Sequence, residues 1–377
     1  MNFVVSSVEL LKHLQSVGKV LNAKNSLPIL DNFLFEVTID KLTMTASDLE
    51  TTLISTLDIE EVSEEGSMCI EARRILDILK EFPEQPLKFD FDMETYIVKV
   101  FSDKGVFQIP GVGIEDFPAL PEIEEEKRNS VQIESEILFK GITNAFFATA
   151  DDELRPIMNG VFVEISNNSV TCVASDAHKL VRYRRRDTMP EIEASFILPK
   201  KSSSLFKSLL PREPENQVKI EFDDKNAFFE FDTYKAVCRF VEGKYPSYNT
   251  VIPETSPIKI VVDRTDFLKT LRRVSVLSNQ ASNLIKLKLT SNNIEVSGQD
   301  IDYAISAVEN LPCQYEGEEI EIGFKSIFLI DILSNLLTDS VSIELADSTR
   351  AGLLLPVANE LKDEDILMLI MPMMLGN

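Results

Sequence analysis

The sequence predicts an α+β protein made of three copies of one unit, each with two helices packed on a mostly antiparallel sheet. Two observations support this fold class: a long internal repeat, and the same order of strand and helix patterns within each copy. The length agrees, because 377 residues are too many for one ordinary core. A content of 44% apolar and 27% charged residues is typical of a globular protein and argues against a disordered chain.

The repeat is clearest between the first two copies, where SLPILDNFLFEV matches LRPIMNGVFVEI. Asp48 matches Asp176 at an offset of 128 residues, and Pro118 matches Pro246 at the same offset much later in the chain. A fainter third copy places Asp300 a further 124 residues after Asp176. Chance matches do not keep one register over such a distance, so we predict three domains. They span residues 1–126, 127–253 and 254–377.

Each copy opens with a strand of alternating apolar residues, such as Phe3–Val5, that leads directly into a helical pattern. A hairpin follows, with alternation over Phe33–Val37 in the first copy and at Phe162 and Glu164 in the second. Polar pairs such as Asn167–Asn168 supply the turns. A second helix and further strands complete the unit. The six helices are predicted over residues 7–19, 71–81, 134–145, 199–212, 264–273 and 324–337.

Several classes of protein are disfavoured. No run of about 18 uncharged apolar residues occurs, and the closing DILMLIMPMMLGN is short and interrupted by Pro372, so no membrane span is predicted and the default location is cytoplasmic. The four cysteines lie far apart without a CxxC pair, and the chain has two histidines. No cofactor, metal site or disulfide framework is therefore predicted, and we expect the cysteines to be buried as small apolar residues.

Two enzymatic interpretations are weak. Ser175, Asp176 and His178 are near neighbours in the chain, whereas the members of a catalytic triad come from separate segments and point at one another. The PGVGIEDF segment has Gly111 and Gly113 but lacks the third glycine and the strand-to-helix setting of a dinucleotide site. We therefore predict that the chain is not an enzyme.

The charge of the chain is unevenly distributed. With 62 acidic and 38 basic residues the net charge is −24, which argues against an ordinary nucleic-acid binder because phosphate contacts need Lys and Arg. The six predicted helices, however, carry +7 and the remainder −31. Two interpretations stay open: basic helix faces that follow phosphates without reading bases, or Lys and Arg acting as good helix formers on solvated faces.

Five motifs together resemble the bacterial DNA sliding clamp family, the beta subunit of DNA polymerase III: LPILDNFLFEV, ASDAHKLV, GKYPSYNTVIP, EIGFKSIFLIDIL and MPMML. The resemblance implies a processivity factor in which two copies join head to tail as a ring of six domains around duplex DNA. It also implies helices around the hole and sheets outside, and as partners the replicative polymerase catalytic subunit, the clamp loader and other clamp-motif proteins. A ring holds DNA topologically, so a weakly positive lining suffices.

The resemblance places contacts to DNA on the helices around the hole and on nearby loops. The matching positions are Lys24, Arg73, Lys80, Lys200 and Lys201. The helix charge count alone adds Arg272 and Arg273 as candidates. The loop with Asp152, Pro156 and Ile157 departs from the polar and aromatic residues usual in the family, so the resemblance does not extend to its contact with DNA.

The resemblance also implies a dimer contact between the first domain of one chain and the third domain of the other. The matching apolar positions are Phe107 on one side and Val276 with Leu277 on the other; burial in an ordinary core is the alternative. The family further has an apolar groove between the second and third domains that binds short linear peptides. The matching positions are Arg155, Met158, Ser175, Ala177, His178, Lys179, Leu180, Pro246, Val251, Phe328, Thr349, Ala351, Leu369, Met371, Pro372, Met373 and Met374.

Methionine suits such a groove, because its unbranched side chain repacks around different partners. This chain has Ala177 where the family commonly has Gly, and Met374-Leu375 followed by Gly376-Asn377 where it commonly ends in Arg-Leu. Its peptide preference is expected to differ accordingly. The LPVANELKDEDI segment is expected to be a solvated loop before a last strand at Ile366–Ile370. The competing hypothesis from another class is a peptide-binding scaffold that does not encircle DNA.

Overall fold

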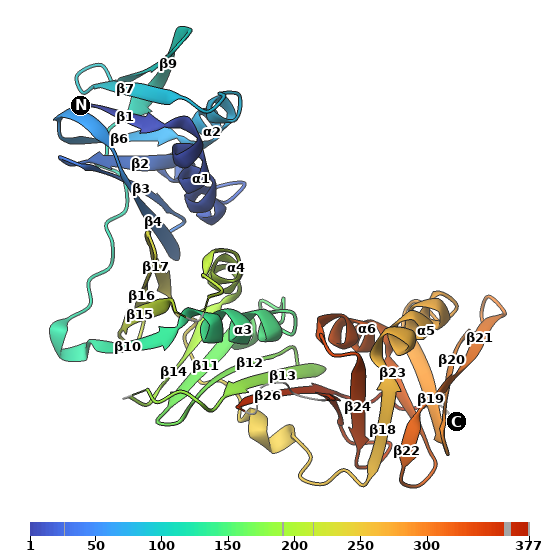
Figure 1. Ribbon diagram of the computed structural model, residues 1–377. Coiled ribbons are helices and arrows are strands. Elements are labelled where there is room, and N and C mark those ends of the chain that lie inside the picture. Colours follow the sequence, from blue (N-terminus) through green and yellow to red (C-terminus); the bar gives the residue numbers. More distant parts are fainter. Residues whose placement is uncertain (26, 191, 214, 358–362, 376–377) are drawn as a thin grey trace. The chain divides into compact units, whose positions relative to one another are not determined.

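The fold class is confirmed by the computed structural model, which describes residues 1–25, 27–190, 192–213, 215–357 and 363–375 (Figure 1). Within these ranges the strand pairings are antiparallel and two helices fall in each of the three copies. The helices are α1 Ser7–Val17, α2 Ala72–Lys80, α3 Ser135–Phe146, α4 Lys200–Leu209, α5 Arg264–Val276 and α6 Ser326–Asn335. No helix in the described ranges is long and apolar enough to cross a membrane.

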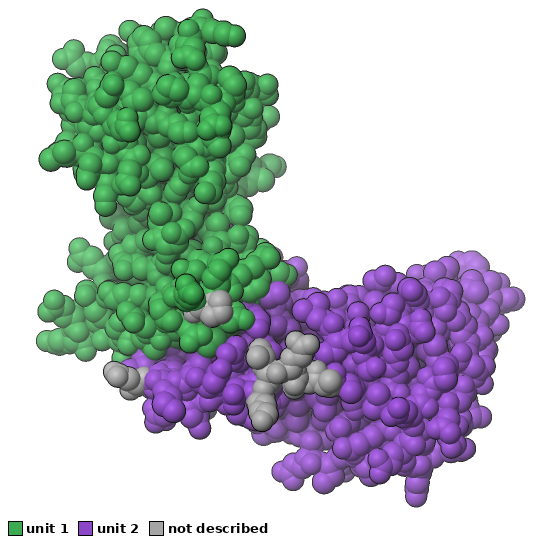
Figure 2. Space-filling view, in the orientation of Figure 1, with its two compact units in different colours: residues 1–139, 204–240 green, residues 140–203, 241–377 purple. Residues whose placement is uncertain are grey.

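The chain divides into two compact units, coloured separately in Figure 2. Unit 1 comprises residues 1–139 and 204–240 and holds a sheet with thirteen strands in its described part. In sheet order these are β10 Asn129–Glu134, β15 Gln217–Phe222, β16 Asn226–Phe231, β17 Tyr234–Arg239, β4 Thr51–Asp58, β3 Lys41–Ser47, β2 Asn32–Val37, β6 Gly66–Glu71, β9 Gly105–Val112, β8 Ile97–Ser102, β7 Pro86–Asp92, β1 Asn2–Ser6 and β5 Glu60–Glu64.

Unit 2 comprises residues 140–203 and 241–377 and, where it is described, holds sheets of nine and four strands. The first is ordered β14 Ala194–Pro199, β11 Gly160–Ser166, β12 Ser169–Ser175, β13 Lys179–Arg185, β26 Glu364–Ile370, β25 Gly352–Pro356, β24 Ser340–Leu345, β18 Ile258–Asp263 and β22 Gln314–Glu316. The second is ordered β21 Ile305–Pro312, β20 Asn293–Asp300, β19 Leu284–Thr290 and β23 Ile320–Lys325. The division into two units cuts the second copy, and the three-domain division stays a prediction.

Two strand pairings join successive copies. β4 of the first copy pairs with β17 of the second, from Thr51–Cys238 to Ser55–Tyr234. β13 of the second copy pairs with β26 of the third over seven residue pairs. Continuous backbone hydrogen bonding therefore links each copy to the next.

A buried histidine lies beside the pairing of β4 with β17. His13 on α1 lies 2.6 Å from Ser55 through Nδ1 and Oγ, and its ring stacks on Tyr234 at 5.9 Å. Burial lowers the pKa of His13, although Glu9 opposes the shift. The imidazole is thus held neutral as part of the packing between α1 and the two paired strands.

The helices lie on the sheets through one apolar face each. α1 buries Leu10, Leu14 and Val17 at helical spacing, and α5 buries Phe267 and Leu271. Asp263 caps α5 by accepting a hydrogen bond from the backbone N–H of Asp266 at 2.8 Å. The predicted helix over 264–273 ended three residues too early, because the apolar pattern of α5 continues through Val274 and Val276.

The alternation predicted for β11 is confirmed: Val161, Val163 and Ile165 face the core, whereas Phe162 and Glu164 lie on the opposite face and are half-buried. Other expectations were wrong. Three cysteines are buried as expected, but Cys313 is partly exposed. The LPVANELKDEDI segment begins in β25 and ends in β26, which starts at Glu364 rather than Ile366. Its middle, 358–362, lies outside the described residues, as does Gly376-Asn377.

Candidate functional site

An apolar cavity with converging polar groups lies in unit 2, where the second and third copies meet. It has a volume of about 330 Å³. One wall is the turn between β12 and β13, and the facing wall is the end of β26. The backbone N–H of Met371 donates to the carbonyl of His178 at 2.8 Å, so the two walls are fixed to each other. We call this cavity the first groove.

The floor of the first groove consists of tightly packed apolar side chains. Leu180 and Leu369 are nearly fully buried, and Tyr245 and Tyr248 pack with them. Tyr245 stacks on Phe162 with ring centroids 4.7 Å apart, which explains why Phe162 faces away from the sheet core. These tyrosines were missed from the sequence, although GKYPSYNTVIP contains both. Both tyrosines are buried and belong to the packed floor.

Tyr248 also has a polar anchor. Its hydroxyl donates a hydrogen bond to the Glu164 carboxylate at 2.8 Å. Glu164, which the sequence placed in a simple alternating strand, therefore fixes the orientation of the Tyr248 ring in the floor. Burial, together with the bond to Glu164, raises the pKa of Tyr248 above its ordinary value. The hydroxyl therefore stays protonated and keeps donating at neutral pH.

The β12–β13 turn has a strained but well-bonded backbone. Ala177 has φ 74°, in the region that favours glycine, which accounts for the glycine that the family commonly has here. The Asp176 carboxylate accepts hydrogen bonds from the backbone N–H groups of His178 and Lys179, and the Ser175 hydroxyl donates to the Lys179 carbonyl. The three polar side chains hold the turn and do not form a catalytic relay.

A helix of the third copy supports the turn from outside. The ring of Phe328 on α6 stacks on His178 with centroids 5.3 Å apart. The buried ammonium of Lys179 lies 2.9 Å from Asp176, 3.5 Å from Asp331 and 4.7 Å from the Phe328 ring centroid. The charge of Lys179 is thus directed toward α6, and its role in the groove is to position the rim.

The structure brings together ten of the predicted groove residues as lining: Met158, Ser175, Ala177, His178, Lys179, Leu180, Pro246, Val251, Leu369 and Met371. Ala351 is buried in the same apolar cluster, and Phe328 supports the rim. The remaining predictions lie away from the lining. The side chain of Arg155 donates a hydrogen bond to Asp152, and that of Thr349 donates one to Asp347. Met373 forms an isolated antiparallel β-bridge with Gly323. Pro372 is half-buried, and Met374 is 88% exposed.

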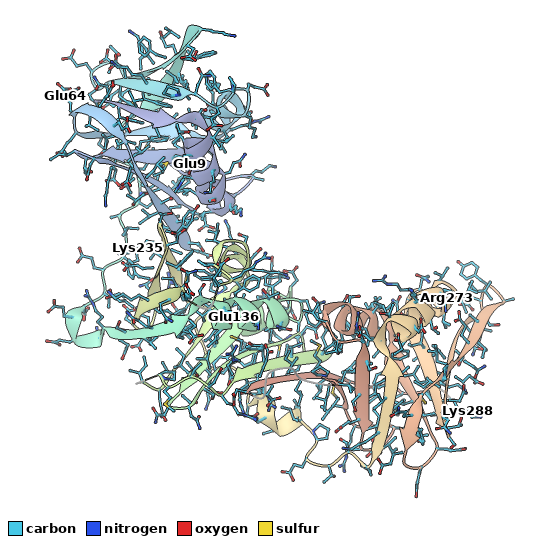
Figure 3. The ribbon with its side chains drawn as sticks, viewed as in Figure 1. Glu9, Glu64, Glu136, Lys235, Arg273 and Lys288 are labelled. Atoms are coloured by element: carbon cyan, nitrogen blue, oxygen red, sulfur yellow. The ribbon has the colours of Figure 1, made fainter. Side chains whose placement is uncertain are left out.

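The basic side chains predicted to meet DNA differ in how far they are neutralised. Lys24 and Arg272 are exposed, and Arg73 and Lys80 both lie near Asp77, at 3.9 and 3.2 Å. Lys200 lies 3.2 Å from Asp151, beside the loop with Asp152, Pro156 and Ile157, while Lys201 is half-buried. Arg273 on α5, labelled in Figure 3, donates two hydrogen bonds to Glu309, of 2.8 and 2.6 Å. Glu309 therefore competes with an external anion for Arg273.

Two exposed strand edges accompany the apolar positions predicted for the dimer. β21 is an edge of its four-stranded sheet, and β9 pairs with β6 only at Gly111 and Val112 in the described part of the chain. Phe107 on β9 packs edge-on against Phe82 at 5.0 Å and borders a cavity of about 580 Å³ beside α2. Val276 at the end of α5 is 68% exposed, and Leu277 is half-buried. Such edges and exposed apolar side chains indicate interaction surfaces.

Comparison with known proteins gives matches along the chain. Three family models match in order: the N-terminal domain of the DNA polymerase III beta subunit over residues 1–121, its central domain over 132–247 and its C-terminal domain over 249–374. The beta sliding clamp of Pseudomonas putida is 28% identical over 377 residues, with both chains fully covered. The beta sliding clamp of Bacillus subtilis is 26% identical, with 99% of each chain covered.

Solved structures agree. The DNA polymerase sliding clamp of Pseudomonas aeruginosa aligns with a TM-score of 0.92 at 27% identity, and the DNA polymerase III beta subunit of Thermotoga maritima with 0.89 at 27% identity. Both alignments cover all of this chain and all of the other.

Proposed function

The chain belongs to the DNA polymerase III beta subunit family, and we propose that it acts as a sliding clamp, encircling duplex DNA and tethering the replicative polymerase. It is a non-catalytic processivity subunit of the polymerase and not an enzyme. The observation that carries the proposal is the match of all three domain models in order, on a chain whose three copies share one arrangement of helices and strands. We keep the boundaries 1–126, 127–253 and 254–377 as its domains.

The sorting of charge supports a role in sliding on DNA. The six helices as observed carry the same net charge of +7 that the sequence predicted. We propose that Lys24, Arg73, Lys80, Lys200, Lys201 and Arg272 contact phosphates. Arg273 contributes less, because Glu309 already binds it. Contacts to phosphates through flexible side chains carry no sequence information, which is what sliding requires.

The exposed edges support a homodimer. We propose that β9 of one protomer pairs with β21 of its partner, so that a sheet continues across the interface. The cavity beside Phe107 then receives the apolar end of the partner's α5, where Val276 and Leu277 lie in each protomer. Because the two surfaces differ, the pairing is head to tail, and two protomers close a ring when each contributes both surfaces.

The first groove supports recruitment through peptides. Its lining is mainly apolar, with His178 and Met371 at the rim and a tyrosine floor, and apolar anchors in such a groove supply most of the affinity for a short peptide. We propose that the replicative polymerase catalytic subunit, the clamp loader and other clamp-motif proteins bind here. The expected location is the cytoplasm, where the replisome works.

Retention on DNA tests the proposed function. The chain is incubated with its clamp loader, ATP and nicked circular DNA, and protein that stays with the DNA is separated by gel filtration. We expect retention on circles and loss after a restriction enzyme linearises them, because a closed ring slides off a free end. If the protein is monomeric at micromolar concentration and is not retained on circular DNA, the proposed ring is contradicted. A peptide-binding scaffold would then be favoured.

Reversing two charges on α4 tests the DNA-facing helices. The double change Lys200→Glu and Lys201→Glu is expected to weaken association with DNA and to lower its log–log salt slope by about 2, since each lost phosphate contact removes about 0.9. Binding of a clamp-motif peptide, measured by fluorescence polarisation, should stay unchanged. Lys88→Glu with Lys225→Glu, on strands and turns of unit 1, provides a control with the same change in net charge. An equal fall in the salt slope of this control would refute the assignment to α4.

A further inference from the structure

The β3–β4 turn of the first copy reproduces the rim of the first groove. Leu49 has φ 79°, as Ala177 has 74°, at equivalent positions 128 residues apart. The Asp48 carboxylate accepts from the backbone N–H groups of Glu50 and Thr51 at 3.0 and 2.7 Å, as Asp176 does in the second copy. The same backbone is therefore built twice, once beside the first groove and once in unit 1.

The facing wall is reproduced as well. The backbone N–H of Arg239, at the end of β17, donates to the carbonyl of Glu50 at 2.9 Å, just as Met371 donates to His178. Val237 pairs with Thr52 where Leu369 pairs with Leu180. Between these walls in unit 1 lies a cavity of about 370 Å³, close in size to the first groove, and we call it the second groove.

The side chains of the second groove differ in chemistry from those of the first. Arg239 stands at the position equivalent to Met371 and Glu50 at that equivalent to His178. Thr52 replaces the buried Leu180, and its hydroxyl lies 2.7 Å from that of Ser47, so the floor is polar. Lys225 adds a second basic side chain to the wall of Arg239. A purely apolar peptide, which suits the first groove, would leave these polar groups desolvated here.

Apolar contacts are nevertheless present. Pro118 and Val237 line the second groove, and Leu49 at its rim leaves 55% of its surface exposed. The side chains that line the groove include two basic ones, Lys225 and Arg239, and one acidic one, Glu50, so the groove favours an occupant with carboxylates. The combination fits an extended segment with aliphatic and acidic side chains in alternation, because alternate side chains of an extended peptide reach opposite walls.

We propose that the second groove is a binding site for an extended acidic peptide segment of a partner protein, distinct in specificity from the first groove. The proposal rests on the peptide-binding role proposed for the first groove, because the two share their backbone. Arg239 and Lys225 bind the carboxylates, and Leu49, Pro118 and Val237 contact the aliphatic side chains. A protomer then holds two partner segments of different chemistry at once.

Fluorescence polarisation with two labelled peptides tests the proposal on the full-length protein. The acidic probe is the hexapeptide acetyl-Ala-Leu-Asp-Val-Glu-Ala, and the other is a clamp-motif peptide. We expect saturable binding of the acidic probe, a rise in its Kd of about tenfold in Arg239→Glu, and a fall in Glu50→Gln. The clamp-motif peptide should bind all variants as before, and Met371→Glu should affect that peptide alone.

Controls separate charge from fold and one groove from the other. Lys88→Glu, on β7 of the same unit, makes the same charge change outside the groove and should leave the Kd of the acidic probe unchanged. A version of the probe with Lys in place of Asp and Glu should recover binding to the double variant Lys225→Glu and Arg239→Glu. Absence of saturable binding, loss of the acidic probe in Met371→Glu, or competition by single-stranded oligonucleotide that depends on Arg239 would each overturn the proposal. Failure of the clamp-motif peptide alone would instead contradict the proposed function.

Discussion

Replacing Met371 with glutamate should abolish binding of a clamp-motif peptide to this chain. Met371 lines the first groove opposite His178, and its side chain is 40% exposed in the empty groove. A bound peptide would cover a carboxylate at this position without supplying a partner, which costs about 3 kcal/mol or more. That corresponds to a Kd at least about 100-fold higher in a fluorescence polarisation titration.

Met374 offers a matched control. It is a methionine three positions later and 88% exposed, and it lies outside the groove lining. Met374→Glu is expected to change the Kd by less than about threefold, although the family resemblance groups it with the groove. If Met371→Glu binds the clamp-motif peptide with unaltered affinity and unfolds thermally like the wild type, this cavity is not the docking site. Equal losses of peptide affinity in both variants would indicate that the docking site lies nearer the end of the chain.

The second large effect is expected at the dimer contact, where Val276→Glu should convert the protein to monomers. Val276 is 68% exposed on the single chain, so the fold should tolerate the change, but the proposed interface would bury the new carboxylate beside Phe107 of the partner subunit. Sedimentation velocity at micromolar concentration should show a single species of half the wild-type mass. Retention on circular DNA should disappear with it, because an open protomer cannot enclose the duplex.

Met189→Glu is the control for this experiment. Met189 is 90% exposed in the segment between β13 and β14, so the substitution makes the same kind of change outside the proposed interface. This variant should remain dimeric and should be retained on circles. A dimeric Val276→Glu protein would show that the end of α5 lies outside the interface, and the exposed edges β9 and β21 would then need other partners.

The order of elements was predictable because the periodicity was strong and appeared three times. Helices such as Ser7–Val17 and Lys200–Leu209 follow directly from apolar spacing after a strand. The face of β11 was not predictable from alternation, because Phe162 is apolar yet packs on Tyr245 outside the sheet core. Alternation indicates two different faces, but a second layer of side chains can cover the outer one.

The candidate site was predictable in part. The turn residues and the end of β26 were found through the repeat and the resemblance, and ten of them line one cavity. Tyr245 and Tyr248 were missed, since aromatic residues beside a proline have no periodicity that assigns them to a floor. The pairing of Arg273 with Glu309 was also beyond the sequence, because the two residues come together only through the packing of α5 on β21.

Because β13 pairs with β26, the first groove is completed only late during synthesis of the chain on the ribosome. Arg182 and Asp365, which form an ion pair across these strands, are 183 residues apart in the chain. While the intervening residues are still being translated, β13 has an open edge and the turn at Asp176 has no facing wall. A peptide that docks in this groove, as we propose, therefore cannot bind a nascent chain before β26 has emerged.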